Sequence, residues 1–339
     1  PHLVRLDCSS NINPLGPPKK AIAAIEMNIT NLVQTYPDPE CRELKKSLSR
    51  HLGIDPKWIN LGNGAIEIIY WFAYSTSMRG RVVIPAPTFC EYEVASQKVG
   101  AEVIFVPLHN FDPDVNKIIE KAKGAHAVFL CNPNNPTGML ATKQILKIIK
   151  NVDSSTRILV DECFIEFTDK PDANTLIQQI SEFDNLVILR SLTKSFGLAG
   201  LRVGYSVCNP TLAKKLSINK IPWNVNGLAQ AAGVAALLEK RYLSKARALL
   251  KKERRFLQDN IERLGSFHPI RSDSNFFLVH LQGRNSTDFR DRLLQRSGVL
   301  VRDCSTFTGM GTQYIRIAIK KHNENMLLLK ALEDFDYGD

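Results

Sequence analysis

Short apolar runs alternate with amphipathic stretches between about residues 58 and 208. The apolar runs are rich in Val, Ile and Leu and predict strands at RVVIP, AEVIFVP, AVFLCNP, RILVDE, NLVILR and RVGYSV. Helical spacing occupies the gaps between the first of them, at 89–99, 113–123 and 142–150. Strands joined by helical crossovers predict an α/β unit with a mostly parallel sheet, in which a ligand lies beyond the carboxyl ends of the strands.

A different pattern follows the last of these strands. Residues 226–264 contain strong helix formers and no proline, which predicts a helical connection between two domains. Beyond it, FHPIR, NFFLVHL, VLVRDC and QYIRIAI read as strands, DFRDRLLQRSG as a helix, and a final helix begins near Glu324. This mixture predicts a small α+β domain. At the other end, NINPLGPPKK predicts an ordered arm that leads into a helix near Lys19.

The length of 339 residues exceeds what one ordinary core organises. We expect an N-terminal arm over residues 1–30, a large domain over 31–235 and a small domain over 236–339. Hydrophobic residues make up 44% of the chain and charged residues 23%, as in soluble globular proteins. No run approaches the roughly 20 apolar residues of a membrane helix, and no signal peptide is visible. We therefore expect a cytoplasmic protein with no membrane partner. Because the chain begins at Pro1 rather than at a methionine, the content of any preceding segment is unknown.

The net charge of +10 raises the question of a nucleic-acid partner. The densest basic run, KKERR at 251–255, lies in a helical pattern with interleaved acids and no aromatic platform, which favours a solvated helix face over a nucleic-acid groove. A positive field equally favours small anionic substrates. The 7 cysteines are scattered without a CxxC pair, which indicates reduced thiols and no metal framework.

Polar motifs follow the predicted strands, where a site is expected. In LGNGAIE, Gly62 and Gly64 precede a helix that starts near Ala65, and backbone N–H groups there can hold an anion. Alone, this motif is a weak signal, because a Gly-Asn-Gly sequence is more often only a turn. In CNPNNPTG, prolines and a glycine fix a loop whose asparagines offer amides to a ligand, and the alternative is a structural Asx-Pro turn.

Two further motifs carry charge. RILVDECFIEF places Asp161 at a strand end, as either a helix cap or a partner for a cation. RSLTKSFGLAGLRVGY places Lys194 beside Ser191 and Thr193, with Arg202 after it. A surface lysine is the simple alternative, but a partly desolvated amine suits Schiff-base chemistry, and hydroxyls with a guanidinium suit a phosphate. Amine, acid, amide and phosphate donors together are what pyridoxal phosphate requires.

With these motifs in this order, the chain resembles the class I/II aminotransferase family of fold-type I pyridoxal-phosphate enzymes, from about Leu6 to the C-terminal helix. SLTKSFGLAGLR is similar to the lysine signature of that family. The resemblance implies the aspartate aminotransferase-like fold, with a large domain built on a mostly parallel seven-stranded sheet and a small α+β domain.

The resemblance also implies roles for individual residues. Lys194 would bind the cofactor aldehyde covalently, and Asp161 would pair with the pyridinium nitrogen, which makes these two the catalytic pair. Asn135 would donate to the ring oxygen, and Phe89 would stack on the ring. Arg316 of YIRIAI would bind the substrate carboxylate through its planar fork.

A second group of residues would hold the cofactor phosphate. Its members supply backbone N–H groups, hydroxyls or a positive charge, and they are Gly64, Ala65, Ser191, Thr193, Arg202 and Tyr36. In the family the tyrosine of the TYPDP motif acts across a subunit interface, so the resemblance implies a homodimer.

Two members of the family have the most similar patterns, namely threonine-phosphate decarboxylases and histidinol-phosphate aminotransferases. SSNINPLGPP and VRDCS resemble the decarboxylases, and Phe164 stands where aminotransferases commonly carry a tyrosine. We therefore expect pyridoxal-phosphate-dependent decarboxylation of L-threonine O-3-phosphate to (R)-1-amino-2-propanol O-2-phosphate, a step of cobalamin biosynthesis. The alternative is the aminotransferase of histidine biosynthesis or a related amino acid aminotransferase.

The predicted substrate is a small phosphorylated amino acid that needs a second anion site. Arg302 is the main candidate, with Asn13 as another, and the alternative for Arg302 is a salt bridge to Asp303. Phe164 has no hydroxyl to donate to the ring oxygen, so the Schiff base should have a higher pKa; its alternative role is simple core packing. Two alternatives that are not enzymes are a cofactor-binding regulator of DNA and a basic nucleic-acid binder.

Overall fold

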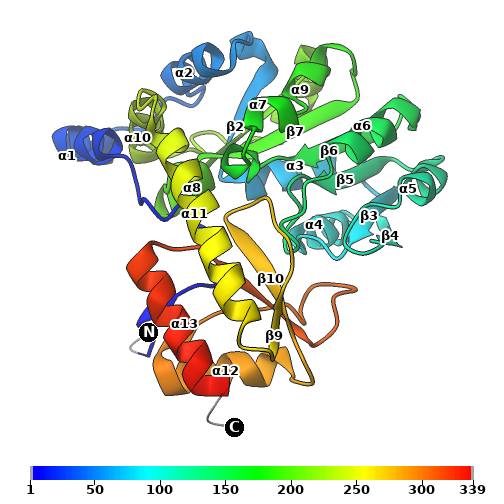
Figure 1. Cartoon of the computed structure of the whole chain (residues 1–339). Coiled ribbons are helices and arrows are strands. Elements are labelled where there is room, and N and C mark those ends of the chain that lie inside the picture. The colour runs from blue at the N-terminus through cyan, green and yellow to red at the C-terminus, as the bar shows by residue number, and fades with distance from the viewer. Residues whose placement is uncertain (1–2, 337–339) are drawn as a thin grey trace.

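A seven-stranded sheet forms the larger part of the computed structural model, which describes residues 3–336 (Figure 1). The strand order is β2-β8-β7-β6-β5-β3-β4. The strands are β2 (Ile59–Asn63), β3 (Arg81–Ala86), β4 (Glu102–Pro107), β5 (Ala127–Cys131), β6 (Arg157–Asp161), β7 (Leu186–Ser191) and β8 (Val203–Cys208). β8 runs antiparallel to both neighbours, and the other neighbouring pairs are parallel. The predicted α/β fold with a mostly parallel sheet is confirmed.

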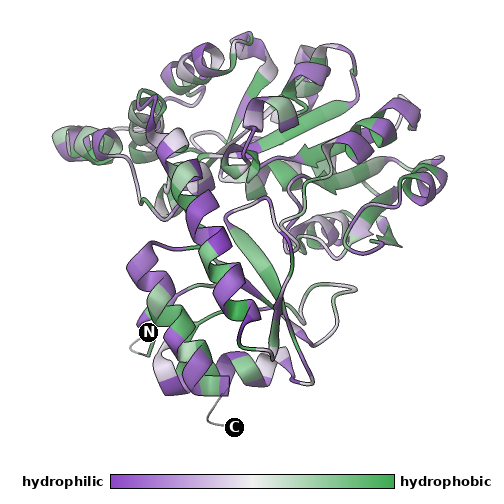
Figure 2. Ribbon diagram, viewed as in Figure 1, coloured by the Kyte–Doolittle hydropathy of each residue, from purple (hydrophilic) through white to green (hydrophobic). Residues whose placement is uncertain are grey.

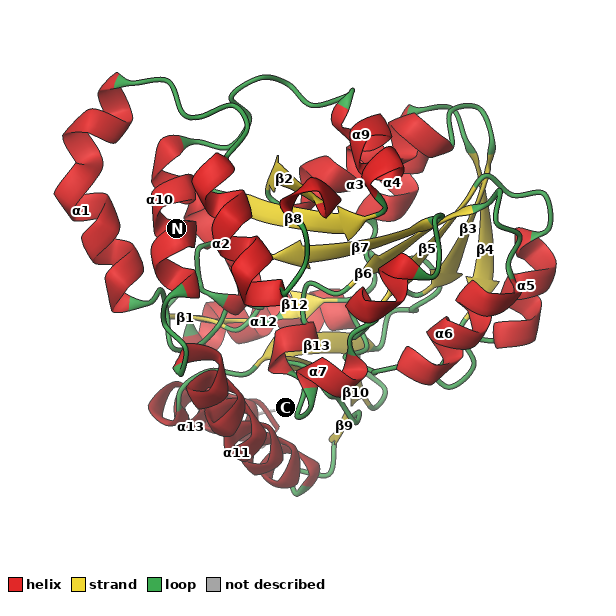
Figure 3. Ribbon diagram, turned by 90° about the horizontal axis from the view of Figure 1, so that it is seen from above, coloured by secondary structure: helices red, strands yellow, loops and turns green. Residues whose placement is uncertain are grey.

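Helices cover both faces of this sheet because alternate residues of each buried strand face opposite ways (Figure 3). In β5, Phe129 joins one core cluster and Val128 the other. One face is covered by α3 (Ala65–Thr76), α4 (Glu91–Lys98) and α9 (Pro210–Ser217). The other is covered by α2 (Arg42–Leu52), α5 (Val115–Ala122), α6 (Thr142–Asn151) and α10 (Gly227–Leu237). The strands are accordingly the most uniformly hydrophobic elements in Figure 2.

The predicted helical stretch at 226–264 is interrupted in the structure. Helix α10 ends at Leu237, and α11 (Tyr242–Glu262) begins after a short turn. α10 packs against α1 (Lys19–Gln34) and α2, whereas α11 runs to β9 and α13. Packing partners at the two ends impose this change of direction, because the turn residues 238–241 contain neither glycine nor proline. Across residues 3–336, no helix combines the length and apolarity that crossing a bilayer requires.

A smaller sheet lies at the far end of α11 (Figure 1). Its order is β12-β13-β10-β9. Its elements and the flanking helices are β9 (Phe267–Pro269), β10 (Phe276–Leu281), α12 (Ser286–Ser297), β12 (Arg302–Asp303), β13 (Tyr314–Ala318) and α13 (His322–Asp336). Short helical turns elsewhere are η1 (Pro56–Trp58), η2 (Ile165–Phe167), α7 (Pro171–Asn174), η3 (Ile177–Ser181), α8 (Leu192–Ser195) and η4 (Ala199–Leu201).

The N-terminal arm bridges the two sheets. β1 (Leu6–Asp7) pairs in parallel with β11 (Val299–Leu300) beside the small sheet. Further along, the Asn13 N–H donates to the Lys194 carbonyl at the end of the large sheet, at 3.3 Å. Residues 9–12 therefore lie between the two sheets. The predicted domain boundaries near residues 30 and 235 stay predictions.

Candidate active site

A cavity of about 490 Å³ opens where the arm, the ends of the large-sheet strands and the small sheet meet. This is the edge at which an open parallel sheet binds its ligand. The predicted site residues that line the cavity are Ala65, Phe89, Asn135, Asp161, Ser191, Thr193, Lys194, Arg202, Arg302 and Arg316. Residues far apart in the sequence thus converge on one chamber.

Lys194 lies in α8, directly after β7, and is partly buried in the cavity wall. Burial lowers the pKa of its amine, and the positive charges of Arg316 and Arg202 lower it further. A lowered pKa increases the fraction of unprotonated amine at neutral pH, which is the form that attacks an aldehyde. Lys194 is therefore equipped for covalent chemistry rather than for a surface ion pair.

Asp161 ends β6 and is 5% exposed. Its carboxyl accepts the Tyr92 hydroxyl at 2.7 Å and the Cys163 backbone N–H at 2.9 Å. Burial raises the pKa of Asp161, although both hydrogen bonds oppose that shift by favouring the ionised form. A buried carboxylate held by two donors is suited to meet a cationic ring nitrogen.

A candidate phosphate cradle lies at the N-terminus of α3. Gly64 caps this helix with φ +79° and ψ 164°, a backbone conformation that is essentially confined to glycine. A Cβ on Gly64 would lie 2.6 Å from Nη2 of Arg202, so only glycine lets the guanidinium approach. The Ser191 and Thr193 hydroxyls are hydrogen-bonded to each other on the cavity wall. Helix N–H groups, hydroxyls and an arginine together make an anion site.

Arg316 is buried in the cavity wall on β13. Its guanidinium donates to Oδ1 of Asn135 and, at 2.8 Å, to the Ser9 carbonyl. Its Nε atom is buried without a hydrogen-bond partner among the described residues. Burial lowers the pKa of Arg316 to about 10. Since the acceptor atom of the Asn135 amide is taken by Arg316, the Nδ2 donor is what this amide can offer to a ring oxygen.

Arg302 is the direct cross-strand partner of Arg316, on β12, and both side chains line the cavity. It donates to Thr306 at 2.9 Å. The alternative salt bridge to Asp303 does not form, because that carboxylate accepts from Ser286 and from the Ser305 backbone instead. Two like charges placed side by side destabilise a sheet unless an anion compensates them. The arginine pair therefore fits a ligand with more than one negative group.

Asn13 does not line the cavity. Its Nδ2 donates to the Ser195 carbonyl at 2.8 Å, and its Oδ1 accepts the Leu15 N–H at 3.0 Å, so the amide is already occupied in fixing the arm. The cavity is instead lined by Asn11, which is 3% exposed and whose Oδ1 has no hydrogen-bond partner among residues 3–336. The prediction of Asn13 as a ligand-binding residue is therefore replaced: the asparagine of the arm that can contact a ligand is Asn11.

Tyr36 does not line this cavity in the single chain. It is 83% exposed, and its ring contacts Trp223 with centroids 5.0 Å apart. Its predicted contact with a phosphate across a subunit interface stays a prediction.

Tyr92 is a site residue that the sequence reasoning missed. It follows Phe89 by one helical turn, so the helical spacing of PTFCEY was a usable signal. The two rings meet edge to face, with centroids 5.6 Å apart. Phe164 also lines the cavity and packs edge-on against Phe276 at 5.0 Å. Phe164 is thus both a core residue and part of the wall.

The sequence pattern of the family described as aminotransferase class I and II matches residues 5–332. The chain belongs to this family. Pyridoxal phosphate is the family's cofactor, and the residues of the cavity fit it: an amine, a buried carboxylate, an amide donor, an aromatic face and an anion cradle. The predicted family, fold and cofactor are confirmed.

Relatives of two activities resemble this family member. A histidinol-phosphate aminotransferase of Symbiobacterium thermophilum is 36% identical over 335 residues, which cover 98% of this chain and 90% of the relative. The crystal structure of the histidinol-phosphate aminotransferase from Clostridium acetobutylicum has 33% identity and a TM-score of 0.92, covering 98% of this chain and 100% of that one. The L-threonine-O-3-phosphate decarboxylase structure from Porphyromonas gingivalis has 27% identity and a TM-score of 0.87, covering 97% and 99%.

Proposed function

We propose that this enzyme decarboxylates L-threonine O-3-phosphate to (R)-1-amino-2-propanol O-2-phosphate. The observation that carries the proposal is the cross-strand pair of Arg302 and Arg316 in the cavity wall. Neither is ion-paired to a carboxylate among the described residues, and Arg316 keeps an unpartnered Nε. An amino acid with a carboxylate and a phosphate supplies two anions to this pair.

The residues divide the work as follows. When bound, pyridoxal phosphate accepts the electron pair that a broken Cα bond leaves behind. Arg316 holds the substrate carboxylate and Arg302 the substrate phosphate, and together they turn the Cα–carboxylate bond perpendicular to the ring plane. After carbon dioxide leaves, the Lys194 amine donates a proton to Cα. No second substrate is needed, because the proton returns to Cα and the cofactor is unchanged.

Two further features support decarboxylation over transamination. Phe164 lines the cavity and cannot donate to the ring oxygen, in contrast to the tyrosine common in the resembling aminotransferases. The arm residues that resemble the decarboxylases, SSNINPLGPP, contribute Ser9, Ser10 and Asn11 to the cavity. These arm residues would therefore contact the substrate directly.

The second candidate function is histidinol-phosphate aminotransfer. The observation that favours it is the 36% identity to the histidinol-phosphate aminotransferase of Symbiobacterium thermophilum, against 33% to a relative from Caldanaerobacter subterraneus named putative threonine-phosphate decarboxylase. In that reaction the amino acceptor 2-oxoglutarate and its product glutamate, both dicarboxylates, would also meet the arginine pair. The two functions share the cofactor residues and differ in the fate of the substrate carboxylate.

We also propose that the active unit is a homodimer. Large apolar side chains are exposed on α1, which precedes Tyr36, with Met27 at 77% and Val33 at 70%, and Ile221, two residues before the Trp223 that contacts Tyr36, is 69% exposed. Covering them with a second copy would remove apolar surface from water and would bring Tyr36 toward the phosphate cradle of the other subunit.

The test of the proposed function separates the two reactions in one experiment. The purified holoenzyme is incubated with L-threonine O-3-phosphate, and separately with histidinol phosphate and 2-oxoglutarate. The proposal expects carbon dioxide from the first mixture and no glutamate from the second. Glutamate formation without gas release would reject decarboxylation and leave the aminotransferase.

A further inference from the structure

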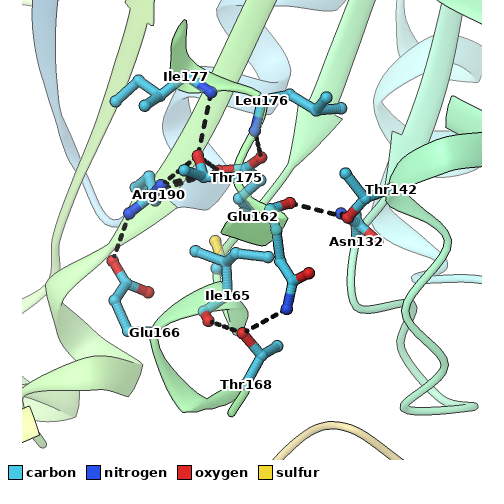
Figure 4. A network of polar contacts seen from close by, with 12 residues as sticks. Asn132, Thr142, Glu162, Ile165, Glu166, Thr168, Thr175, Leu176, Ile177 and Arg190 are labelled. Atoms are coloured by element: carbon cyan, nitrogen blue, oxygen red, sulfur yellow. Dashed lines mark hydrogen bonds and ion pairs between the residues drawn. The ribbon is translucent and has the colours of Figure 1, made fainter. Parts of the chain in front are cut away.

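A buried charge cluster lies on the opposite side of the strand ends from the cavity. Successive side chains of a strand point to opposite faces, so Asp161 faces the cavity while Glu162 points away from it. At the end of β7, Ser191 lines the cavity and Arg190 points away. Glu162 and Arg190 meet behind the site, with side chains 0% and 8% exposed (Figure 4).

The Arg190 guanidinium uses its planar fork to hold three separate segments. Its Nε and Nη2 donate to Oε2 of Glu162 at 3.1 and 2.9 Å, at the end of β6. Its Nη1 donates to Oε1 of Glu166 at 3.0 Å, in the η2 turn, and its Nη2 also donates to Thr175 at 2.7 Å. Glu162 accepts the Leu176 N–H at 2.6 Å as well, so each segment is tied to the same centre (Figure 4).

The cluster sets the two carboxyls of Glu162 and Glu166 against the one guanidinium of Arg190, and all three side chains are largely buried. Burial raises the pKa of both Glu162 and Glu166, and the positive charge of Arg190 opposes that shift. Burial alone would lower the pKa of Arg190, but the charges of Glu166 and Glu162 outweigh it and raise the pKa. Removing either kind of partner leaves an uncompensated charge, which is strongly unfavourable in a protein interior.

The segments tied together here are the ones that carry the cofactor residues. The end of β6 carries Asp161, the turn before η2 carries Phe164, and the residues after Arg190 carry Ser191 and Lys194. We propose that Arg190, through Glu162 and Glu166, is a positioning residue that fixes Asp161 and Lys194 at the distance the cofactor requires. The proposal rests on the cofactor and not on the choice of reaction, so it applies equally to decarboxylation and aminotransfer.

The test compares Glu162→Gln and Arg190→Lys with Glu253→Gln as a matched control. Glu253 is also 0% exposed and accepts the Asn325 amide at 2.9 Å, but it lies on α11 outside the cavity. For each variant, the dissociation constant of pyridoxal phosphate, the pH midpoint of the visible band of the bound cofactor and the thermal unfolding temperature are measured. Arg190→Lys keeps the positive charge and loses the fork, which isolates geometry from charge.

The expected result is a dissociation constant raised by about 10-fold or more in both cluster variants, together with a shifted pH midpoint, as is typical when a group that orients a ligand-binding residue is removed. Glu253→Gln should lower the unfolding temperature and leave both cofactor readouts unchanged. If the cluster variants lose thermal stability like the control and keep the wild-type constant and midpoint, Arg190 is structural only and the proposal fails. If Glu162→Gln does not fold, Arg190→Lys alone decides by the same two readouts.

Discussion

Replacing Tyr92 by Phe removes one hydroxyl from the site and leaves its ring in place. That hydroxyl donates to Asp161 at 2.7 Å, and Tyr92 is fully buried and stacked on Phe129 with ring centroids 5.2 Å apart. The ring packing should persist, so the loss is confined to the hydrogen bond. Because the bond favours ionised Asp161, its loss raises the pKa of that carboxyl above its already raised value.

The magnitude follows from the charge on the acceptor. A hydrogen bond to a charged group contributes about 1.5–3 kcal/mol, and each 1.4 kcal/mol corresponds to about a factor of ten in binding. If Asp161 pairs with the ring nitrogen only when ionised, the variant should bind pyridoxal phosphate on the order of 10- to 100-fold more weakly at neutral pH. The defect should shrink as the pH rises, because higher pH restores ionised Asp161 without help from Tyr92.

The assay is an equilibrium titration of the cofactor-free protein with pyridoxal phosphate at several pH values. Tyr70→Phe is the matched control, since the Tyr70 hydroxyl donates to Glu91 at 3.1 Å and Tyr70 does not line the cavity. The control should stay within about twofold of the wild type. A Tyr92→Phe protein with wild-type affinity at every pH would refute the assignment of Asp161 as the ring-nitrogen partner.

The remaining predictions concern the cradle, the substrate phosphate and the buried acid. Gly64→Ala should destabilise the protein by about 1–3 kcal/mol through backbone strain and also weaken cofactor binding by displacing Arg202, both read in a thermal scan with and without cofactor; unchanged binding would contradict the cradle. Arg302→Gln should raise KM for the phosphorylated substrate by roughly 10- to 100-fold with a smaller effect on kcat, and an unchanged KM would exclude it as the phosphate anchor. Burial raises the pKa of Asp161 above its ordinary value of 3.8, so protonated Asp161 stabilises the fold at low pH. That stabilisation is lost as the pH rises from 3.8 through the raised pKa. Cofactor-free Asp161→Asn should therefore gain in unfolding temperature relative to the wild type as the pH increases, and a constant difference would argue against the burial effect.

Most of the large sheet was predictable because its strands are buried on both faces and read as continuous apolar runs, as in RILVD and NLVIL. β2 was harder to see, because INLGN is short, half polar and ends in a glycine turn. The break between α10 and α11 carries no local signal, since residues 238–241 are ordinary helix formers and only tertiary packing turns the chain there.

Within the site, motif residues at strand ends were predictable because topology brings strand ends to one edge. Which of Asn11 and Asn13 lines the cavity was not predictable, because the two residues lie only two positions apart in an irregular arm. They are distinguished only by the hydrogen bond that occupies Asn13 with the Ser195 carbonyl. The Arg190 cluster was missed for a different reason. A charged residue in a buried strand is recognisable, but its partners in η2 and near Thr175 become visible only once the chain is folded.

The fate of the substrate carboxylate distinguishes decarboxylation from aminotransfer. L-Threonine O-3-phosphate carrying a carbon label in its carboxyl group is turned over by the holoenzyme in deuterium oxide, and both gas and product are analysed by mass. Decarboxylation by this site should release one labelled carbon dioxide per turnover. The product should be an aminopropanol phosphate with a single deuterium at the former Cα, placed there by Lys194, and Lys194→Ala should form neither. A product that retains the labelled carboxyl and has lost its amino group would contradict decarboxylation.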